Sequence, residues 1–196
     1  MTIIGITGPT GAGKTTLLRE IETLGGTVID CDAVYHEMLE SDIALQNKLE
    51  NAFGPLRDQH GAIDRKKLGT IVFADPEQLN ILDSIVQGAV CDRVRTLVDE
   101  CAAQGRSLAA IDAIGLLEGD LQAMCDTTIA VVAPPEVRVT RIMAREGISE
   151  EYAWARVRAQ KPDQYFTDGC DHTLVNDCDS AQTFGARARE LLKTLL

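Results

Sequence analysis

The sequence predicts an α/β fold, in which a parallel sheet of about five strands carries helices on both faces. Three observations support this class. Short apolar runs of strand length alternate along the chain with longer stretches of helical periodicity. A glycine-rich loop joins the first apolar run to the first helical stretch. Residues 33–101 hold helical patterns and no convincing strand, so they form a connection longer than a minimal crossover between parallel strands.

Composition limits the classes of protein to consider. The chain has 196 residues, 45% hydrophobic and 25% charged, which is ordinary for one globular domain. A net charge of −11 argues against a general nucleic-acid binder, because phosphate contacts need a basic surface. No leader pattern or apolar stretch of membrane-spanning length is present, and the six cysteines show no C-x-x-C spacing. We therefore expect a cytoplasmic protein, a monomer or weak homo-oligomer, with small-molecule substrates and neither nucleic-acid nor membrane partners.

The first strand is expected at Ile3–Thr7, and the loop that follows carries the clearest chemical signal. Residues 8–15 fit the pattern G-x-x-x-x-G-K-[ST], which cradles phosphates. Its glycines allow a tight turn that points backbone N–H groups at one anion, and the helix that follows adds its positive end there. Lys14 can reach the β- and γ-phosphates, and the Thr15 hydroxyl can bind Mg²⁺. Together with the strand before it and the helix after it, this loop predicts a three-layer P-loop NTPase fold that uses ATP and Mg²⁺.

The second strand is expected at Thr27–Ile29, and two carboxylates follow it. Strand ends in an open parallel sheet face the ligand crevice, so we expect Asp30 and Asp32 to point toward the phosphates. Asp32 is the candidate general base that orients an acceptor hydroxyl and takes its proton. Asp30 could position Asp32 or contact magnesium. The alternative is that one of the two acids only caps the following helix.

The long connection after this strand is interpreted as a helical acceptor lobe over about residues 33–104. Its length suits a second substrate. The core of this single domain, which spans residues 1–196, then comprises residues 1–32, 105–135 and 170–196. Within the lobe the apolar periodicity predicts four helices, separated by glycine and proline breaks, at residues 33–39, 44–53, 65–73 and 76–101.

Three further strands complete the predicted sheet, at residues 107–112, 127–132 and 174–176, and a terminal helix is expected at 181–196. The first of these strands ends in Asp112. It resembles a Walker B strand, whose carboxylate helps to hold Mg²⁺, often through water.

Residues 138–162 form a candidate lid. Arg138, Arg141 and Arg145 recur at spacings of three and four, so they share one helix face, and Ser149 is expected to cap the next helix. We interpret the arginines as side chains that close over transferring phosphates and stabilise their charge. The alternative is a solvated helix face paired with nearby glutamates, namely Glu146, Glu150 and Glu151.

An ordered set of motifs resembles the dephospho-CoA kinase family over nearly the whole chain. The set consists of residues 8–16, Asp30-Cys31-Asp32, Leu116-Leu117-Glu118, the stretch from Arg141 to Gln160, and Val175-Asn176-Asp177. The resemblance implies transfer of the γ-phosphoryl group of ATP to the ribose 3′-hydroxyl of dephospho-CoA, which is the last step of CoA synthesis.

The same resemblance implies roles for individual residues. Asp32 would act on the 3′-hydroxyl, while Lys14, Arg141 and Arg145 would hold the phosphates. The phosphate-loop motif and the Walker B-like strand, independently of this resemblance, assign Thr15 and Asp112 to magnesium. The residues expected to bind ATP are Gly8, Gly11, Ala12, Gly13, Lys14, Thr15, Thr16 and Asn176, the last of them near the adenine.

This chain departs from the family pattern at three places, all where the acceptor is expected. Cys31 and His36 replace the usual alanine and arginine, and Gln87-Gly88 replaces a His-Pro pair. The stretch Ile114–Glu118 lacks the usual proline and Phe-Glu ending.

Two other functions are compatible with a phosphate-binding loop. One is another small-molecule kinase of the same fold, of the shikimate or nucleotide type. A shikimate-type enzyme also places Asp-x-Asp after its second strand, but it is shorter and has more glycines near the third strand than Ala113-Ile114-Gly115. The other is a nucleotide-dependent switch. Val175–Cys178 does not supply the Asn-Lys-x-Asp that reads guanine, and Lys14 and Thr15, which a binding-only loop would be expected to lose, are both present.

Overall fold

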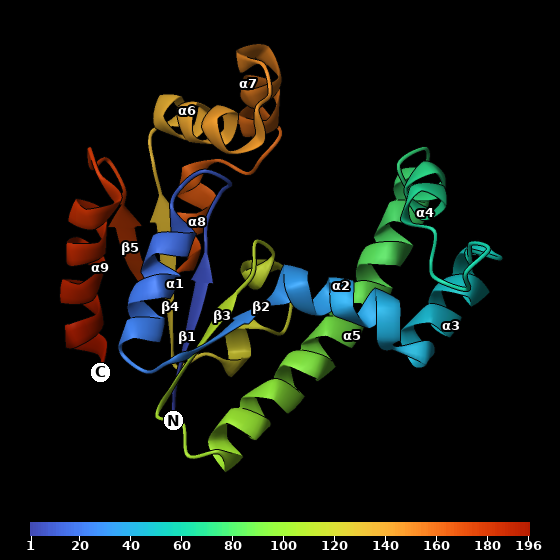
Figure 1. Cartoon of the computed structure of the whole chain (residues 1–196), viewed down its shortest axis with the longest axis horizontal. Coiled ribbons are helices and arrows are strands. Elements are labelled where there is room, and N and C mark those ends of the chain that lie inside the picture. The colour runs from blue at the N-terminus through green and yellow to red at the C-terminus, as the bar shows by residue number, and fades with distance from the viewer. The chain divides into compact units, whose positions relative to one another are not determined.

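The computed structural model describes residues 1–196 and is built on a five-stranded sheet (Figure 1). The strand order is β2-β3-β1-β4-β5, so the first strand is central. Strand β1 pairs in parallel with both β3 and β4, and β4 pairs in parallel with β5. The strands are β1 (Thr2–Thr7), β2 (Thr27–Asp30), β3 (Leu108–Asp112), β4 (Thr127–Val132) and β5 (His172–Val175). The predicted α/β class with a sheet of five strands is therefore confirmed.

Nine helices and two short 3₁₀ turns connect and cover the strands. The helices are α1 (Lys14–Thr23), α2 (Cys31–Ser41), α3 (Ile43–Phe53), α4 (Arg65–Val72), α5 (Pro76–Ala103), α6 (Pro135–Glu146), α7 (Glu150–Arg158), α8 (Asp163–Gly169) and α9 (Ala181–Leu195). The 3₁₀ turns are η1 (Leu116–Glu118) and η2 (Gln122–Met124). None of these helices is both long enough and apolar enough to cross a membrane.

The last strand and one helix differ from the sequence prediction. The last strand ends at Val175, so Asn176 follows the strand instead of lying within it. Helix α8 was not predicted, because it has only seven residues and a single buried side chain, Phe166, which is too little for a periodic pattern to show.

The chain folds into two compact units. The first contains residues 1–29 and 98–196, and the second contains residues 30–97. The first unit holds the central strands, the phosphate-loop segment and helices α6 to α9. The second is mainly helical, with a loop bridged between Arg57 and Ile63. It begins at residue 30, before the start of the acceptor lobe predicted over about residues 33–104, and ends at residue 97. The acceptor role of this lobe stays a prediction.

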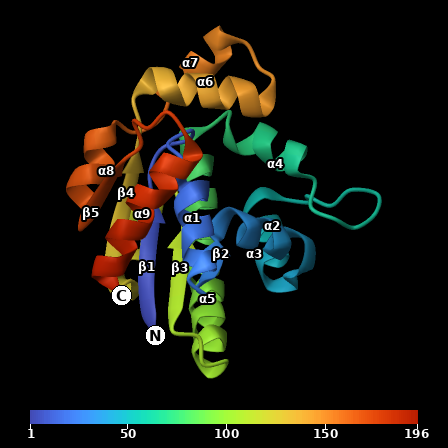
Figure 2. The ribbon, with the colours of Figure 1, turned by 60° about the vertical axis from the view of Figure 1, so that its left-hand side comes forward.

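Helices cover both faces of the sheet in the first unit. On one face α1 and α9 lie alongside each other in both ribbon views (Figures 1 and 2). Their buried residues, including Leu17 and Phe184, join inward-facing residues of β1, β3 and β4 in one apolar cluster. On the other face Phe166 of α8 packs against Ala130 and Val132 of β4. Alternate residues of the strands therefore meet different helices, as the period of a strand dictates.

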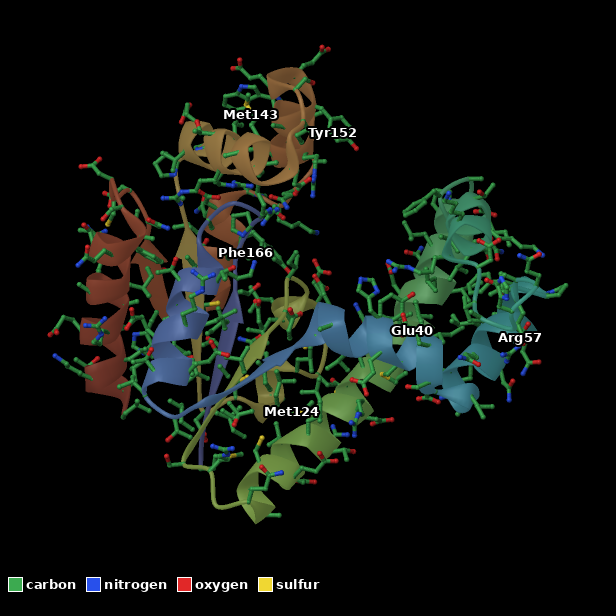
Figure 3. The ribbon with its side chains drawn as sticks, in the orientation of Figure 1. Glu40, Arg57, Met124, Met143, Tyr152 and Phe166 are labelled. Atoms are coloured by element: carbon green, nitrogen blue, oxygen red, sulfur yellow. The ribbon has the colours of Figure 1, made fainter.

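Helices α6 and α7 form a small apolar core of their own beyond the carboxyl ends of the strands (Figure 1). Val139, Ile142, Ala153 and Val157 make up this core, and Met143 packs against it (Figure 3). Ser149 caps α7 as predicted, because its hydroxyl accepts the backbone N–H of Tyr152 at 3.3 Å.

Three successive helices of the second unit begin with an aspartate cap. The side chains of Asp30, Asp42 and Asp64 each accept two backbone N–H groups from the first turn of α2, α3 and α4 respectively. Arg57 (labelled in Figure 3) then ties α3 to the loop after it, through hydrogen bonds of 3.0 Å to Gln46 and 3.0 Å to Glu50. Local capping therefore explains where these helices start.

Candidate active site

The loop between β1 and α1 has a backbone that only glycine adopts readily. Gly8, Gly11 and Gly13 have φ angles of 136°, 82° and 106°. A Cβ atom on Gly8 would stand 2.0 Å from the carbonyl oxygen of Val131, and one on Gly13 would stand 2.2 Å from Nδ2 of Asn176. The glycines are therefore required both for the turn and for the close approach of β4 and of Asn176. This is the cradle that the motif predicts.

Lys14 begins α1, and its side chain folds back over the loop. Its ammonium group donates a hydrogen bond to the carbonyl oxygen of Gly8 at 2.9 Å. That contact keeps the positive charge of Lys14 at the loop, where it would meet an oxyanion bound by the backbone N–H groups.

Two predicted site residues from different elements meet on the backbone of this loop. Asn176, directly after β5, is buried, and its Nδ2 donates to the carbonyl oxygen of Ala12 at 2.8 Å. Arg141 of α6 donates to the carbonyl oxygens of Gly11 and Ala12, both at 3.3 Å. Burial lowers the pKa of the Arg141 guanidinium, but an arginine keeps its charge at neutral pH. A positive charge is therefore held against the phosphate loop.

The three arginines of α6 have different environments. Arg138 is almost fully buried, with 3% of its surface exposed, and its Nε donates to the carbonyl oxygen of Thr10 at 3.0 Å. Arg145 is exposed and pairs with Glu146 at 2.7 Å. Glu146 also pairs with Arg156, and the hydrogen bond from Arg145 is the main reason that the pKa of the Glu146 carboxyl is lowered. Arg138 and Arg141 therefore contact the loop and Arg145 does not, while the phosphate roles expected of Arg141 and Arg145 stay predictions.

The end of β3 is fastened beside the end of β1. Asp112 stands opposite Ile6 in the parallel register, and the hydroxyl of Thr7 donates to the carbonyl oxygen of Ile114 at 3.1 Å. The predicted magnesium ligand Asp112 thus ends the strand next to the one that leads into the phosphate loop.

The two residues expected to bind magnesium suit that ion chemically. Thr15 and Asp112 offer a hydroxyl and a carboxylate, which are the hard oxygen donors that Mg²⁺ takes together with water and substrate phosphates. No group of three or more His, Cys, Asp or Glu side chains forms a self-sufficient metal site. The donor set therefore fits a magnesium ion that arrives with a nucleotide.

In the second unit, Asp30 and Asp32 play different parts. Oδ1 of Asp30 accepts the backbone N–H groups of Asp32 at 2.9 Å and of Ala33 at 3.1 Å, so Asp30 is the cap of α2. The cap uses only the backbone N–H of Asp32, and Asp32 itself is exposed. The capping alternative therefore applies to Asp30, while the catalytic role of Asp32 remains a hypothesis.

A cavity of about 560 Å³ opens beside the phosphate loop within the first unit. It has an apolar side formed by residues such as Pro9, Ile114 and Phe166, and a polar side that includes Glu118 and Lys161. Figure 3 labels Phe166 at this end of the sheet. Nζ of Lys161 lies 3.9 Å from the carboxylate of Glu118. A second cavity, of about 630 Å³, is lined only by residues 136–154 and contains no loop residue.

Sequence reasoning gave Thr10 no role and placed Gln160 only within the lid. The structure brings them together, since Nε2 of Gln160 donates to the Thr10 hydroxyl at 2.7 Å. These residues are 150 positions apart, so no local pattern could have paired them.

Comparisons with known proteins identify the family. The family model described as dephospho-CoA kinase matches residues 2–182. A dephospho-CoA kinase of Carboxydothermus hydrogenoformans is 35% identical over 161 residues, which is 82% of this chain and 78% of the relative. One of Anaeromyxobacter dehalogenans is 34% identical over 197 residues, covering 100% of this chain and 92% of the relative.

Solved structures share the fold of this chain. TT1252 from Thermus thermophilus has a TM-score of 0.80 and 32% identity, covering 100% of this chain and 97% of that one. Dephospho-CoA kinase from Campylobacter jejuni, at 23% identity with a TM-score of 0.70 over 98% of this chain and 96% of that one, shares the fold. So does a shikimate kinase from Bacteroides thetaiotaomicron, at 16% identity with a TM-score of 0.52 over 98% of each chain. The match over residues 2–182 is consistent with the glycine cradle and the parallel sheet around it. The chain belongs to the dephospho-CoA kinase family.

Proposed function

We propose that this protein transfers the γ-phosphoryl group of ATP to the 3′-hydroxyl of dephospho-CoA and so completes CoA biosynthesis. The observation that carries the donor half is the loop of three left-handed glycines with the Lys14 ammonium 2.9 Å from the carbonyl oxygen of Gly8. Family membership over residues 2–182 supports the acceptor half.

The loop would bind ATP through its backbone. The N–H groups of the loop and of the first turn of α1 would surround the phosphates, and Lys14 would neutralise their charge. Phosphoryl transfer needs little covalent chemistry from a protein, so fixed positive groups around the phosphates account for most of the rate. The proposed ATP-binding residues are Gly8, Gly11, Ala12, Gly13, Lys14, Thr15, Thr16 and Asn176.

Arg141 is the better supported of the two proposed catalytic arginines. It already contacts the carbonyl oxygens of Gly11 and Ala12. Arg145 would have to exchange its ion pair with Glu146 for a phosphate contact. The first would act as a fixed charge, whereas the second would act only after it leaves Glu146.

Magnesium would be held by Thr15 and Asp112 together with the nucleotide. When bound there, the ion would supply positive charge against the charge that develops on the phosphates. The protein's own part is to present two oxygen donors and leave the remaining positions to phosphate and water.

Asp32 would orient the acceptor hydroxyl and take its proton as the phosphoryl group transfers. The cavity beside Pro9 offers room for part of an acceptor next to the phosphate loop, with an apolar side for a ring or chain and Lys161 for an anionic group.

The proposal is tested with a panel of acceptors. The protein is incubated with ATP and Mg²⁺ and with dephospho-CoA, shikimate or a nucleoside monophosphate, and the products are identified by mass. We expect CoA from dephospho-CoA and no phosphorylation of the other two, with the Lys14→Ala variant as the inactive control. Preferred phosphorylation of shikimate or a nucleotide would contradict the acceptor assignment. ATP hydrolysis without any acceptor product would favour a switch.

A further inference from the structure

Both ends of the α6–α7 segment are bonded to a single residue of the phosphate loop, Thr10. From the start of the segment, Nε of Arg138 donates to the carbonyl oxygen of Thr10 at 3.0 Å. From its far end, just past α7, Nε2 of Gln160 donates to the Thr10 hydroxyl at 2.7 Å. Oε1 of Gln160 in turn accepts the backbone N–H of Thr10 at 3.1 Å. We call Thr10, Arg138 and Gln160 the Thr10 clamp.

The clamp engages the backbone N–H, the carbonyl and the hydroxyl of Thr10. Thr10 sits between Gly8 and Gly11, both of which have left-handed backbones. Pro9 precedes it, and the carbonyl oxygen of Pro9 accepts the backbone N–H of Ala12 at 3.2 Å, so the clamp adds to a turn that the backbone already makes. The N–H of Thr10 is already used in its hydrogen bond to Oε1 of Gln160. The role of this residue is therefore to hold the shape of the loop, while other N–H groups are left for the ligand.

Arg138 links the two halves of the clamp. Its guanidinium also hydrogen-bonds to Oε1 of Gln160, and its Nη1 lies 3.2 Å from a carboxylate oxygen of Asp163. Burying a guanidinium is costly, and desolvation lowers the pKa of Arg138, although Asp163 opposes this effect. The bonds to Thr10, Gln160 and Asp163 offset that cost only while all the partners stay in place.

The packing around the clamp is equally close. A Cβ atom on Gly11 would lie 2.9 Å from the carbonyl oxygen of Arg138 and 3.1 Å from its Cα. The beginning of α6 therefore rests directly on the loop. Arg141, one turn further along the same helix, contacts Gly11 and Ala12 from this base.

We propose that Arg138 is a positioning residue for phosphoryl transfer, which shapes the phosphate loop through Thr10 and sets the place of Arg141 by securing both ends of the α6–α7 segment. It does not itself contact the phosphates. The proposal rests on the proposed function only in that the loop binds ATP.

The first test is binding of Mg²⁺-ATP without any acceptor, measured by calorimetry. Arg138→Met keeps the apolar stem and removes every hydrogen bond of the guanidinium. We expect the Kd for ATP to rise by about tenfold, which corresponds to about 1.4 kcal/mol of binding free energy. Arg138→Lys keeps one bond and should restore part of the affinity. A Kd for ATP within twofold of wild type in Arg138→Met would overturn the proposal.

A matched control separates positioning from stability. Ile142 lies on the same helix, in the apolar core of α6 and α7, and takes no part in the hydrogen bonds of the Thr10 clamp. The substitution Ile142→Val is expected to destabilise the protein modestly. We expect it to keep the wild-type Kd for ATP and KM for both substrates. The two variants are compared by the rise in Kd for ATP at an equal loss of Tm. If Ile142→Val raises this Kd as much as Arg138→Met does, the role of Arg138 is structural and the proposal fails.

Steady-state kinetics supply the second test. We expect Arg138→Met to raise the KM for ATP and lower kcat, while the KM for dephospho-CoA stays within about twofold. Gln160→Met should have a similar effect on kcat and on the KM for ATP. The fold loss of kcat/KM in the double variant should be much smaller than the product of the two single losses, because each single variant already breaks the same clamp. Multiplicative losses would contradict a shared clamp. If wild type makes no CoA, the proposed function fails, and the ATP-binding test of the clamp still decides the inference.

Discussion

Nη2 of Arg141 lies 3.1 Å from Oδ1 of Asn176, and both side chains also donate to the carbonyl oxygen of Ala12. One residue comes from α6 and the other follows β5, so this contact joins two elements to the phosphate loop. Asn176 is buried and Arg141 is half-buried, which makes the loss of either partner costly.

Replacing Asn176 with alanine is expected to lower the free energy of unfolding by about 1–3 kcal/mol, because a buried carbonyl and a guanidinium lose a partner. The KM for ATP should rise as well. Urea denaturation and steady-state kinetics measure the two effects. Asp177→Asn is the matched control, since Asp177 is exposed and accepts hydrogen bonds from Arg187 and, at 4.0 Å, from the thiol of Cys178. This substitution should change stability by less than about 0.5 kcal/mol.

The Lys14→Ala variant tests the phosphate assignment. Removing a cation aimed at the transferring group is expected to lower kcat by roughly 10²–10³. The melting temperature should change little, because the side chain lies over the loop instead of in the apolar core. Near-normal turnover at saturating ATP would show that the phosphates bind elsewhere.

Asp32→Asn tests the proposed general base. We expect kcat to fall by roughly 10²–10⁴ while the Kd for ATP is unchanged, because the carboxylate would serve the acceptor. Asp42→Ala is the control, since Asp42 caps α3 in the same unit and its loss should cost about 1 kcal/mol of stability without lowering kcat. An unchanged kcat with weaker ATP binding in Asp32→Asn would instead place Asp32 at the metal.

Magnesium dependence tests Asp112. We expect a chelator to abolish activity and Asp112→Asn to raise the Mg²⁺ concentration needed for half-maximal rate, because one anionic oxygen donor is lost. The measurement is a magnesium titration at saturating ATP, with Asp120→Asn, an exposed site after η1, as the control. Identical titration curves for Asp112→Asn and wild type would remove Asp112 from the proposed site.

Acid stability is expected to depend on Asp171. Its carboxylate accepts the backbone N–H and the hydroxyl of Thr128, both at 2.8 Å, and the hydrogen bond from that hydroxyl is the main cause of its lowered pKa. A folded-state pKa below the unfolded value stabilises the protein above about pH 4, and this contribution is lost as pH falls through the folded-state value. Asp171→Asn should therefore be less stable by about 1 kcal/mol at pH 7, a figure discounted for its exposure. The difference in unfolding free energy between wild type and Asp171→Asn should be smaller at pH 3, and urea denaturation at the two pH values measures it. An equal difference at pH 3 and pH 7 would contradict this prediction.

Local patterns in the chain were enough to predict the α/β class, the five strands and the phosphate loop. These signals depend on neighbours in sequence: the two-residue period of a strand, the period of a helix, and glycines that supply left-handed turns. Ser149 could be predicted as a cap for the same reason, whereas the short helix α8 was missed because seven residues hold too little periodicity.

Only the tertiary structure decided which of the α6 arginines contact the phosphate loop. Helical spacing places Arg138, Arg141 and Arg145 on one face, yet it does not say what lies opposite each turn. Strand β4 delivers the start of α6 to the phosphate loop, and a helix rises about 1.5 Å per residue, so Arg145 is about 10 Å further along the axis than Arg138. Arg138 is therefore buried against Thr10, Arg141 reaches Ala12, and Arg145 is left exposed with Glu146. Such long-range contacts depend on where each strand ends and the next helix begins in space. A local sequence pattern contains no information about that position.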